Sequence, residues 1–477
     1  MKKIHIIGGG LAGPEAALQA ASAGCDVTLF EMRPTRSTEA HQTADFAELV
    51  CSNSLKSESE NTAPWLLKQE MRRANCFLLR AADACAVPAG HALAVDRVLF
   101  SARVAELIAA HPRIAVVREE VTRLDENDPE TITILASGPL TSPALAAELQ
   151  RLTGAEHLAF YDSISPIVDA SSIDMDKVYF AARWDKGTAD YINCPFTKEE
   201  YDTFLDALIV AEKVAPKLWE RIPAAGSPLG DNQAVAEDGA PAAAGLQYFE
   251  GCLPIEEIAR RGRDTLRFGP MKPAGLTNPR TGRWPYAAVQ LRQENLRVDS
   301  YNLVGFQNHL KFSEQKKVLR LIPGLENATF LRYGQIHRNT YIHAPTLLTE
   351  TLQLRAHPSI LIAGQLSGVE GYTESIASGL LAGRYAATLA RGDQPGPAPR
   401  PSANGSLMHY ITHADAKKFV PANITFDLLP PLEEELRKKI RDKKERHRMQ
   451  CERGLEAWTD WLQKPTPLDQ GTGQATA

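Results

Sequence analysis

Cysteine is scarce in this chain and shows none of the spacings that mark a metal site. The 477 residues include seven cysteines, far fewer than a disulfide-stapled scaffold needs. No two of them form a C-x2-C pair, the spacing typical of structural zinc sites. We therefore expect reduced thiols, a cytoplasmic location and no bound metal.

Long hydrophobic runs and a charge excess of one sign are also missing. The longest uncharged stretch near membrane-span length, Thr131–Ala147, contains two prolines and a glycine, so we expect no spanning helix. The apolar run Ile4–Ile7 is too short for a secretion signal, because glycines end it at once.

With 53 Lys and Arg against 58 Asp and Glu, the net charge is −5. This balance excludes a protein that is basic throughout, but not one with a local basic patch for nucleic acid.

A glycine-rich turn lies between a predicted strand and a predicted helix near the N-terminus. Its residues fit G-x-G-x-x-G: Gly8, Gly9, Gly10, Leu11, Ala12 and Gly13. In this motif the glycines allow a tight turn, close approach to a pyrophosphate and close packing of the helix on the strand. Glu31 ends the next predicted strand, where a carboxylate would accept the ribose hydroxyls. The pattern predicts a dinucleotide site, although a glycine turn alone can be purely structural.

A second glycine segment favours FAD as the dinucleotide. Leu361–Gly364 has the pattern of a buried strand that ends in a glycine, and a small-residue helix follows from about Glu374. In flavoproteins a late strand of the same sheet commonly ends in this way and leads to a helix whose N-terminus faces the flavin. The alternative is an ordinary strand–turn–helix connection.

The order and length of the predicted elements change along the chain, and this change indicates the fold class. Residues 3–34 form a βαβ pattern, whereas short strands and turns dominate from about 155 to 340. We predict an α/β protein with a FAD-binding Rossmann-type domain and a smaller inserted α+β domain. Pro223–Gln247, with 15 Ala, Gly or Pro among 25 residues, is interpreted as a surface loop. The predicted units are 1–154 and 341–392 (FAD-binding domain), 155–340 (inserted substrate domain), 393–464 (linker and helical segment) and 465–477 (disordered tail).

Two cysteines stand in unusual surroundings. Cys51 lies among small polar residues in Leu49–Leu55, and Cys252 lies shortly before a predicted helix that carries Arg260 and Arg261. Each is a candidate catalytic thiol, and the alternative for each is a small buried core residue.

Several motifs together resemble one family, the methylenetetrahydrofolate–tRNA-(uracil-5-)-methyltransferases, which depend on folate and flavin. The tracts around Cys51 and Cys252 are the most specific, and the resemblance covers residues 3 to about 390. The matching stretches are Gly8–Gly13, Leu29–Pro34, Phe46–Leu55, Pro88–Gly90, Ala92–Arg97, Gly138–Ser142, Tyr191–Pro195, Phe249–Gly262, Phe268–Pro273, His337–Tyr341 and Gly368–Ser375.

The resemblance implies a reaction and the residues that carry it. The enzyme would methylate C5 of a T-loop uridine in tRNA, with methylenetetrahydrofolate as carbon donor, reduced FAD as reductant and NADH or NADPH as electron source. A thiolate adding to C6 makes C5 nucleophilic. We assign that attack to Cys252, and we expect Cys51 near the flavin, where it helps to remove the C5 proton or guards the methylene intermediate. Tyr372 is the candidate for stacking on the flavin or the pterin, and the inserted domain would hold the folate.

The tRNA partner requires basic surface. Candidates are the run Arg437–Arg448 and the group Lys311, Lys316, Lys317 and Arg320, with a solvated charged face as the alternative. Two other functions remain open: the same chemistry on a uridine of ribosomal RNA, and a non-catalytic RNA-binding flavoprotein. The presence of both Cys51 and Cys252 argues against the second.

Overall fold

The structure is a computed structural model and describes residues 1–38, 40–154, 158–214 and 253–463. Three predicted features lie outside the described residues: the loop Pro223–Gln247, Cys252 and the tail 465–477. None of the described helices is long and apolar enough to cross a membrane.

Five parallel strands form the central sheet, in the order β16-β7-β1-β2-β6. The strands are β1 (Lys3–Ile7), β2 (Val27–Phe30), β6 (Ile114–Val117), β7 (Thr131–Leu135) and β16 (Ile360–Ile362). β-branched residues dominate them, as expected for strands buried inside an α/β domain. β1 pairs with β2 on one side and β7 on the other, so the chain enters the fold through its central strand.

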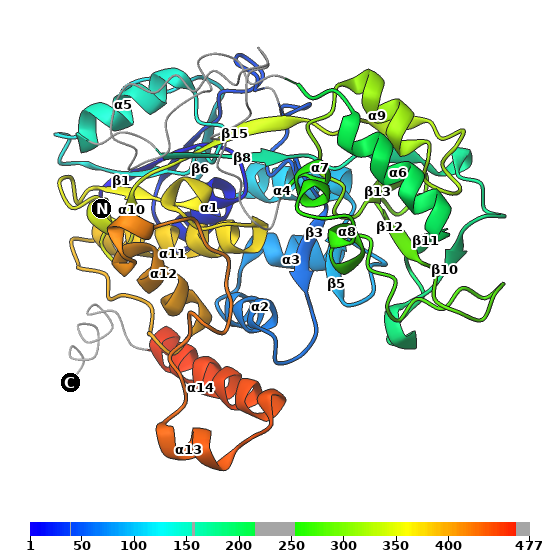
Figure 1. The fold of residues 1–477 in the computed structure, drawn as a ribbon. Coiled ribbons are helices and arrows are strands. Elements are labelled where there is room, and N and C mark those ends of the chain that lie inside the picture. Colours follow the sequence, from blue (N-terminus) through cyan, green and yellow to red (C-terminus); the bar gives the residue numbers. More distant parts are fainter. Residues whose placement is uncertain (39, 155–157, 215–252, 464–477) are drawn as a thin grey trace, which may run out of the picture.

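Two helices far apart in the sequence pack side by side against this sheet: α1 (Ala12–Ser22) and α11 (Tyr372–Ala390) (Figure 1). Their contact depends on glycine. A Cβ on Gly379 would lie 2.3 Å from the carbonyl oxygen of Ala12, and a Cβ on Gly383 would lie 2.5 Å from that of Ala16. Small residues thus let the two backbones approach closely.

A second sheet has six strands in the order β10-β11-β12-β13-β9-β14, and all its pairs are antiparallel. Its elements are β9 (Ile167–Asp169), β10 (Tyr179–Phe180), β11 (Ile192–Phe196), β12 (Ala287–Gln293), β13 (Ser300–Leu303) and β14 (Phe330–Arg332), with helices α6 (Lys198–Val210), α7 (Ile255–Arg260), α8 (Thr265–Phe268) and α9 (Phe312–Leu319). These elements share a hydrophobic core between Val168 and Ala328 that is distinct from the core around the parallel sheet. The exact boundaries of the predicted units remain predictions.

Smaller elements connect and cover the two sheets. The strands β8 (Leu158–Ser163) and β15 (Ile336–Tyr341) form an antiparallel ribbon, and β3 (Ser54–Ser57), β5 (Ala92–Val95) and β4 (Ala86–Val87) form a three-stranded sheet. The remaining helices are α2 (Ala63–Arg73), α3 (Phe77–Ala84), α4 (Arg97–Ala110), α5 (Pro143–Thr153), α10 (Ala344–Leu347) and α12 (Ala403–His413).

The charged stretch 432–454 of the predicted C-terminal helical segment does not form one continuous helix. The structure has two helices, α13 (Glu434–Lys439) and α14 (Lys443–Gln463), of which α14 packs beside α2 (Figure 1). The break has a local cause. Asp442 accepts the backbone N–H of Lys444 through its side chain at 3.0 Å and that of Arg446 through its carbonyl oxygen at 3.1 Å, so it starts a new helix.

Candidate functional site

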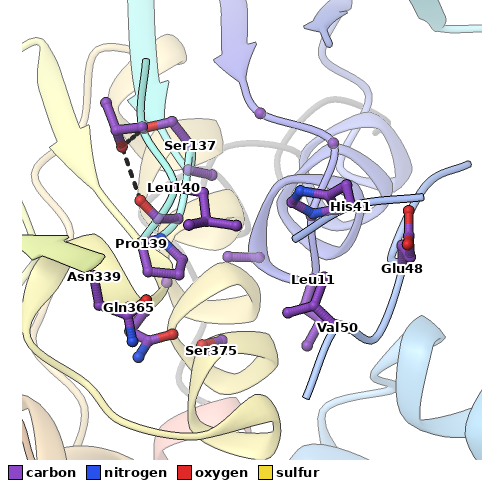
Figure 2. A pocket seen from close by; sticks show the side chains of 18 of the residues that line it. Leu11, His41, Glu48, Val50, Ser137, Pro139, Leu140, Asn339, Gln365 and Ser375 are labelled. Atoms are coloured by element: carbon purple, nitrogen blue, oxygen red, sulfur yellow. Dashed lines mark hydrogen bonds between the residues drawn. The ribbon is translucent and has the colours of Figure 1, made fainter. Parts of the chain in front are cut away.

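A cavity of about 310 Å³ opens where the strands of the parallel sheet end (Figure 2). Residues directly after four of the strands line it: Gly8 after β1, Glu31 after β2, Ala136 after β7, and Gly364, which follows Ala363 after β16. The crevice at the carboxyl ends of parallel strands is where α/β folds bind their ligands. Of the predicted cofactor residues, Gly8, Gly9, Gly10, Leu11, Ala12, Glu31, Gly364 and Tyr372 line the cavity, as does Cys51.

The three motif glycines have different surroundings. A Cβ on Gly8, which has φ +116°, would lie 2.4 Å from the carbonyl oxygen of Ala136, and a Cβ on Gly13 would lie 1.8 Å from that of Gly8. A Cβ on Gly10 would meet nothing within 4 Å. Gly8 and Gly13 are therefore required by the fold, and Gly13 packs beneath the turn. Gly10 borders open space in the cavity, where a ligand could approach the backbone.

Glu31 is almost fully buried and holds the glycine turn. One carboxylate oxygen accepts the backbone N–H of Gly9 at 2.7 Å, and the other accepts the backbone N–H and the Nε of Arg33 at 2.9 and 2.8 Å. Burial opposes ionisation, but the hydrogen bonds and charge of Arg33, with the Gly9 N–H, outweigh it and lower the pKa of the carboxyl. Glu31 is thus an anion at the cavity wall, and Arg33, buried beside it, is a partner that the sequence analysis did not single out.

The N-termini of two helices meet at this cavity. α1 begins after Leu11 and α11 begins after Gly371, and neither first turn is capped by a side chain. Gly371 has φ +109°, a backbone conformation that favours glycine. Free N–H groups and the positive end of the helix dipole attract anionic or polar ligand groups. The arrangement offers one such helix end beside the glycine turn and another beside Gly364.

Tyr372 ties the start of α11 to the loop that carries Cys51. Its hydroxyl oxygen accepts the backbone N–H of Cys51 at 2.7 Å and that of Ser52 at 3.3 Å. Burial, followed by the charge at Cys51, raises the pKa of the tyrosine hydroxyl, so it stays neutral. The structure therefore brings together Cys51 and Tyr372, which the sequence analysis chose for separate reasons.

Arg292 on β12 holds the same loop from the second sheet. Its Nε donates to Oδ1 of Asn53 at 2.9 Å, and its Nη2 donates to Oγ of Ser52 at 2.7 Å. Burial lowers the pKa of this guanidinium. Asn53 is itself fully buried and donates its Nδ2 to the carbonyl oxygens of Val95 and Gln293 at 3.1 and 3.0 Å. The loop after Cys51 is thus fixed between β5 and β12.

Two further guanidinium groups lie within electrostatic reach of Cys51. Arg97 donates its Nη1 to the carbonyl oxygen of Leu49 at 2.5 Å and pairs with Glu294 at 2.6 Å. Arg332 donates to the carbonyl oxygen of Ala40, and its buried Nε has no hydrogen-bond partner among the described residues. Positive charge near a thiol is the environment in which reactive cysteines occur.

Asn339 is an unsatisfied polar group in the cavity wall. It is 1% exposed, and neither Oδ1 nor Nδ2 has a hydrogen-bond partner among the described residues. Figure 2 shows Asn339 among the side chains that line the cavity. An unpaired buried amide carries a desolvation penalty of about 1–3 kcal/mol. A ligand edge that presents both a donor and an acceptor would remove this penalty.

The predicted helix that carries Arg260 follows the position of Cys252. Cys252 itself lies outside the described residues, and α7 begins three residues later. Arg260 is the last residue of α7 and Arg261 follows it, whereas Glu256 and Glu257 occupy the first turn. Arg260 also lies 3.8 Å from Glu257. The arginines therefore lie at the C-terminal end of this helix, and a contribution of their charge to the Cys252 thiol remains a prediction.

Several of the basic residues that the sequence offers for tRNA form ion pairs at the surface. Lys311 pairs with Glu212, and Lys317 pairs with Glu314 at 2.6 Å. In the C-terminal helices Lys438 pairs with Glu434 at 2.8 Å, and Arg448 pairs with Glu445 at 2.6 Å. Exposed pairs of this kind are weak. A role in binding phosphates remains a prediction.

Comparisons with known proteins give consistent results. The family model described as glucose inhibited division protein A matches residues 3–394. The chain is 65% identical over 460 residues to the methylenetetrahydrofolate–tRNA-(uracil-5-)-methyltransferase TrmFO of Koribacter versatilis, covering 96% of this chain and 98% of that one. It is 50% identical over 462 residues to the protein of the same name from Enterococcus faecalis, covering 97% and 99%.

Among solved structures, GidA of Aquifex aeolicus aligns with a TM-score of 0.65 at 16% identity, covering 97% of this chain and 75% of that one. At this identity the likeness concerns the fold alone. Together with the parallel sheet and the second, antiparallel sheet, it confirms the predicted fold class.

Proposed function

The chain belongs to the family of methylenetetrahydrofolate–tRNA-(uracil-5-)-methyltransferases, as its sequence resemblance predicts, and from this membership we propose that it methylates C5 of a T-loop uridine in tRNA. The carbon donor is methylenetetrahydrofolate, reduced FAD is the reductant, and NADH or NADPH supplies the electrons. The observation that carries the proposal is the convergence of the glycine turn, the start of α11 and the Cys51 thiol at one cavity.

The residues around the cavity fit FAD. The backbone from Gly8 to Ala12 and the uncapped start of α1 would hold the pyrophosphate, and the Glu31 carboxylate lies where the ribose hydroxyls would be accepted. Gly364 and the start of α11 would face the flavin, and the unpaired amide of Asn339 offers it a donor and an acceptor. When bound, FAD supplies carbon-transfer and redox chemistry that no side chain can provide.

The chain's own thiols supply the covalent chemistry on the base. In the proposed mechanism the Cys252 thiolate adds to C6 of uracil, and the electron pair of the C5–C6 double bond moves toward the C4 carbonyl, which makes C5 nucleophilic. After the carbon unit is attached, the C5 proton leaves, and the sulfur–C6 bond breaks to restore the ring. Cys252 is then free for the next turnover.

Cys51 is assigned the second role, at the cavity. Its loop is fixed by Tyr372 from α11 and by Arg292 through Ser52 and Asn53. A thiol held in this position beside the flavin site is suited to remove the C5 proton or to protect the methylene intermediate. Arg97 and Arg332 would stabilise negative charge on it. Tyr372, at the same wall, remains the candidate for stacking on the flavin or the pterin.

The proposal is tested by incubating the purified protein with unmodified tRNA, methylenetetrahydrofolate and NADH or NADPH, followed by mass spectrometry of the nucleosides. We expect 5-methyluridine in the T loop, and none when the folate is omitted. Parallel reactions with ribosomal RNA test the alternative substrate. A yellow, FAD-containing protein that modifies neither RNA would contradict the proposal and favour a non-catalytic RNA-binding flavoprotein.

The roles of the two cysteines can be distinguished by testing cysteine variants on tRNA that contains 5-fluorouracil. Fluorine cannot leave C5 as a proton, so a C6-attacking thiol stays attached to the RNA. Cys252→Ala should lose both this adduct and turnover while retaining FAD, because deleting a covalent nucleophile lowers rates by up to about 10^6. Cys51→Ala should lose turnover with a changed flavin spectrum. If Cys252→Ala retains near-normal methylation, the nucleophile is Cys51, because the thiol of Cys194 on β11 is fully buried.

A further inference from the structure

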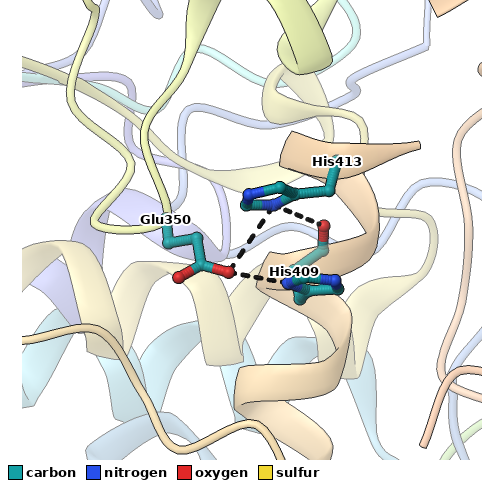
Figure 3. Close-up of side chains that lie close together, drawn as sticks. All are labelled: Glu350, His409 and His413. Carbon is teal, nitrogen blue, oxygen red and sulfur yellow. Dashed lines mark hydrogen bonds and ion pairs between the residues drawn. The ribbon is translucent and has the colours of Figure 1, made fainter. Parts of the chain in front are cut away.

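Three metal-ligating side chains meet near the C-terminal end of α12, outside the cavity (Figure 3). His409 and His413 are one helical turn apart, and their rings stack with centroids 4.3 Å apart. One carboxylate oxygen of Glu350 lies 2.7 Å from Nδ1 of His409 and 3.5 Å from Nδ1 of His413. The three residues each offer a ligand atom, and these atoms all lie within 4.8 Å of one another. None of the three lines the cavity.

The backbone holds these side chains in place before any ligand binds. Glu350 lies in a tight turn in which the N–H of Leu352 donates to the carbonyl oxygen of Thr349 at 2.9 Å. The N–H of Thr349 in turn donates to the carbonyl oxygen of Gln353 at 3.0 Å. Glu350 therefore projects from a rigid turn rather than from a long flexible loop.

The helix that carries the two histidines is equally well anchored. Ser402 caps α12 by accepting the N–H of Gly405 at 2.9 Å. The buried Glu70 accepts the N–H groups of Ala403 and Asn404 at 2.6 and 2.9 Å. Ligands on rigid elements lose little entropy when an ion binds.

We propose that Glu350, His409 and His413 form a binding site for one divalent transition-metal ion of the Zn²⁺ class. Imidazole with carboxylate is a donor set that suits Zn²⁺, with bonds of about 2.0–2.2 Å. Tetrahedral coordination at these lengths places neighbouring ligand atoms about 3.3 Å apart. The observed separations of 2.7 and 3.5 Å lie on either side of this value, so small side-chain movements suffice.

The remaining contacts of the cluster affect how tightly it would bind an ion. Nδ1 of His413 lies 3.3 Å from the carbonyl oxygen of His409. The same nitrogen faces Glu350, so it would give up this contact to bind the ion, which argues for moderate affinity. The three side chains are between 34% and 48% exposed, so water can complete the coordination. Arg400 lies within electrostatic reach of Glu350 and opposes a cation, which argues for moderate affinity.

The ion would have a structural role. It would join the turn before β16 to α12, and so connect the C-terminal helices to the parallel sheet that carries the cavity. A ligand that binds only the folded state raises the melting temperature. The reaction itself would not require the ion.

The experiment is a titration of the untagged, FAD-containing, full-length protein with Co²⁺, followed by visible absorption, with Zn²⁺ measured by competition. We expect one equivalent of Co²⁺ without the near-ultraviolet band that a thiolate ligand produces, and a higher melting temperature with Zn²⁺. His409→Ala, His413→Ala and Glu350→Gln should each weaken binding by roughly tenfold or more, because even outer-shell changes at metal sites have effects of this size.

His111→Ala is the matched control, because this histidine is half-buried at the end of α4, belongs to no such cluster among the described residues, and should leave binding unchanged. The melting temperature of each variant without metal shows whether it is folded. The proposal is overturned if the wild-type protein binds neither ion at submillimolar concentration. It is equally overturned if a thiolate band appears or if folded cluster variants bind as tightly as the wild type.

Discussion

The hydroxyl of Tyr372 accepts the backbone N–H of Cys51 at 2.7 Å, although 321 positions separate the two residues. Tyr372 is the first residue of α11, and Cys51 lies in a loop that follows the first βαβ unit. The contact fixes a candidate catalytic thiol relative to the helix proposed to face the flavin. Through this contact, a shift in the position of α11 should change the position of the thiol.

Tyr372→Phe should remove this link between α11 and the loop that carries Cys51. The phenyl ring keeps its place in the wall, but the N–H groups of Cys51 and Ser52 lose their acceptor, which lowers the free energy of unfolding by about 1 kcal/mol. Misplacement of the thiol should reduce methylation by about 10- to 100-fold while FAD remains bound. Steady-state kinetics and flavin content provide the measurement.

Tyr385→Phe is the control for this change. Tyr385 is a buried residue of the same helix, and its hydroxyl accepts the N–H of Ala398 at 3.0 Å. It should lose similar stability without losing rate, because it does not line the cavity. Equal rates for Tyr372→Phe and the wild type would show that the hydroxyl contact has no role in turnover.

Gly10→Val should lose FAD binding, whereas Gly13→Ala should lose stability. At Gly10 a side chain projects into open space, so the apoprotein should fold with a near-normal melting temperature but lose FAD and its yellow colour. At Gly13 even a Cβ would lie 1.8 Å from the carbonyl oxygen of Gly8, so the protein should be severely destabilised. Thermal melts of the apoproteins and flavin absorbance separate the two effects. A yellow Gly10→Val protein with normal FAD affinity would place the pyrophosphate elsewhere.

Asn339→Leu should weaken ligand binding without lowering the stability of the apoprotein. The amide of Asn339 is buried and unpaired among the described residues, so a side chain of similar size without polar atoms removes a penalty and no hydrogen bond. We expect an apoprotein melting temperature equal to or above that of the wild type, with at least tenfold weaker binding of FAD or of the folate. Loss of apoprotein stability with unchanged binding of both ligands would assign Asn339 a purely structural role.

Glu256 should make stability depend on pH near neutrality. Burial raises the pKa of its carboxyl to about 7 from 4.5, and one of its oxygens is unpaired among the described residues. Because the folded state then holds a proton that the unfolded state has released, this group stabilises the fold more at pH 6 than at pH 8. The difference amounts to about 1.4 kcal/mol. Denaturant unfolding at both pH values should show this dependence in the wild type and a weaker one in Glu256→Gln, where the buried Glu70, whose pKa is also raised to about 7, still titrates. Identical pH dependence in the two proteins would mean that Glu256 does not titrate in this range.

Local patterns in the sequence were sufficient for the central part of the fold. The glycine turn, Glu31 and the small-residue helix after Gly364 follow from short-range periodicity and turn chemistry, and all of them reach the same cavity. Sequence position could not show that Glu31 binds Arg33 and the Gly9 N–H, because those contacts depend on how the turn folds back.

Contacts between distant segments were beyond the reach of the sequence. Arg292 and Asn339 lie in strands where nothing local distinguishes them, and their importance arises from distant segments that the fold brings together. The matched tract His337–Tyr341 contained Asn339 and was the available signal. Cysteine spacing cannot reveal a site built from histidine and carboxylate, so the His409 and His413 pair was not predicted, although its one-turn spacing is visible in the sequence.

The source of the methyl carbon tests the central claim most directly. The measurement is mass spectrometry of 5-methyluridine from tRNA incubated with the FAD-containing protein, NADH or NADPH, methylenetetrahydrofolate labelled with ¹³C in its methylene group, and unlabelled S-adenosylmethionine. The account predicts that every new methyl group carries the label and that omitting S-adenosylmethionine changes nothing. Unlabelled 5-methyluridine that forms only when S-adenosylmethionine is present would contradict it.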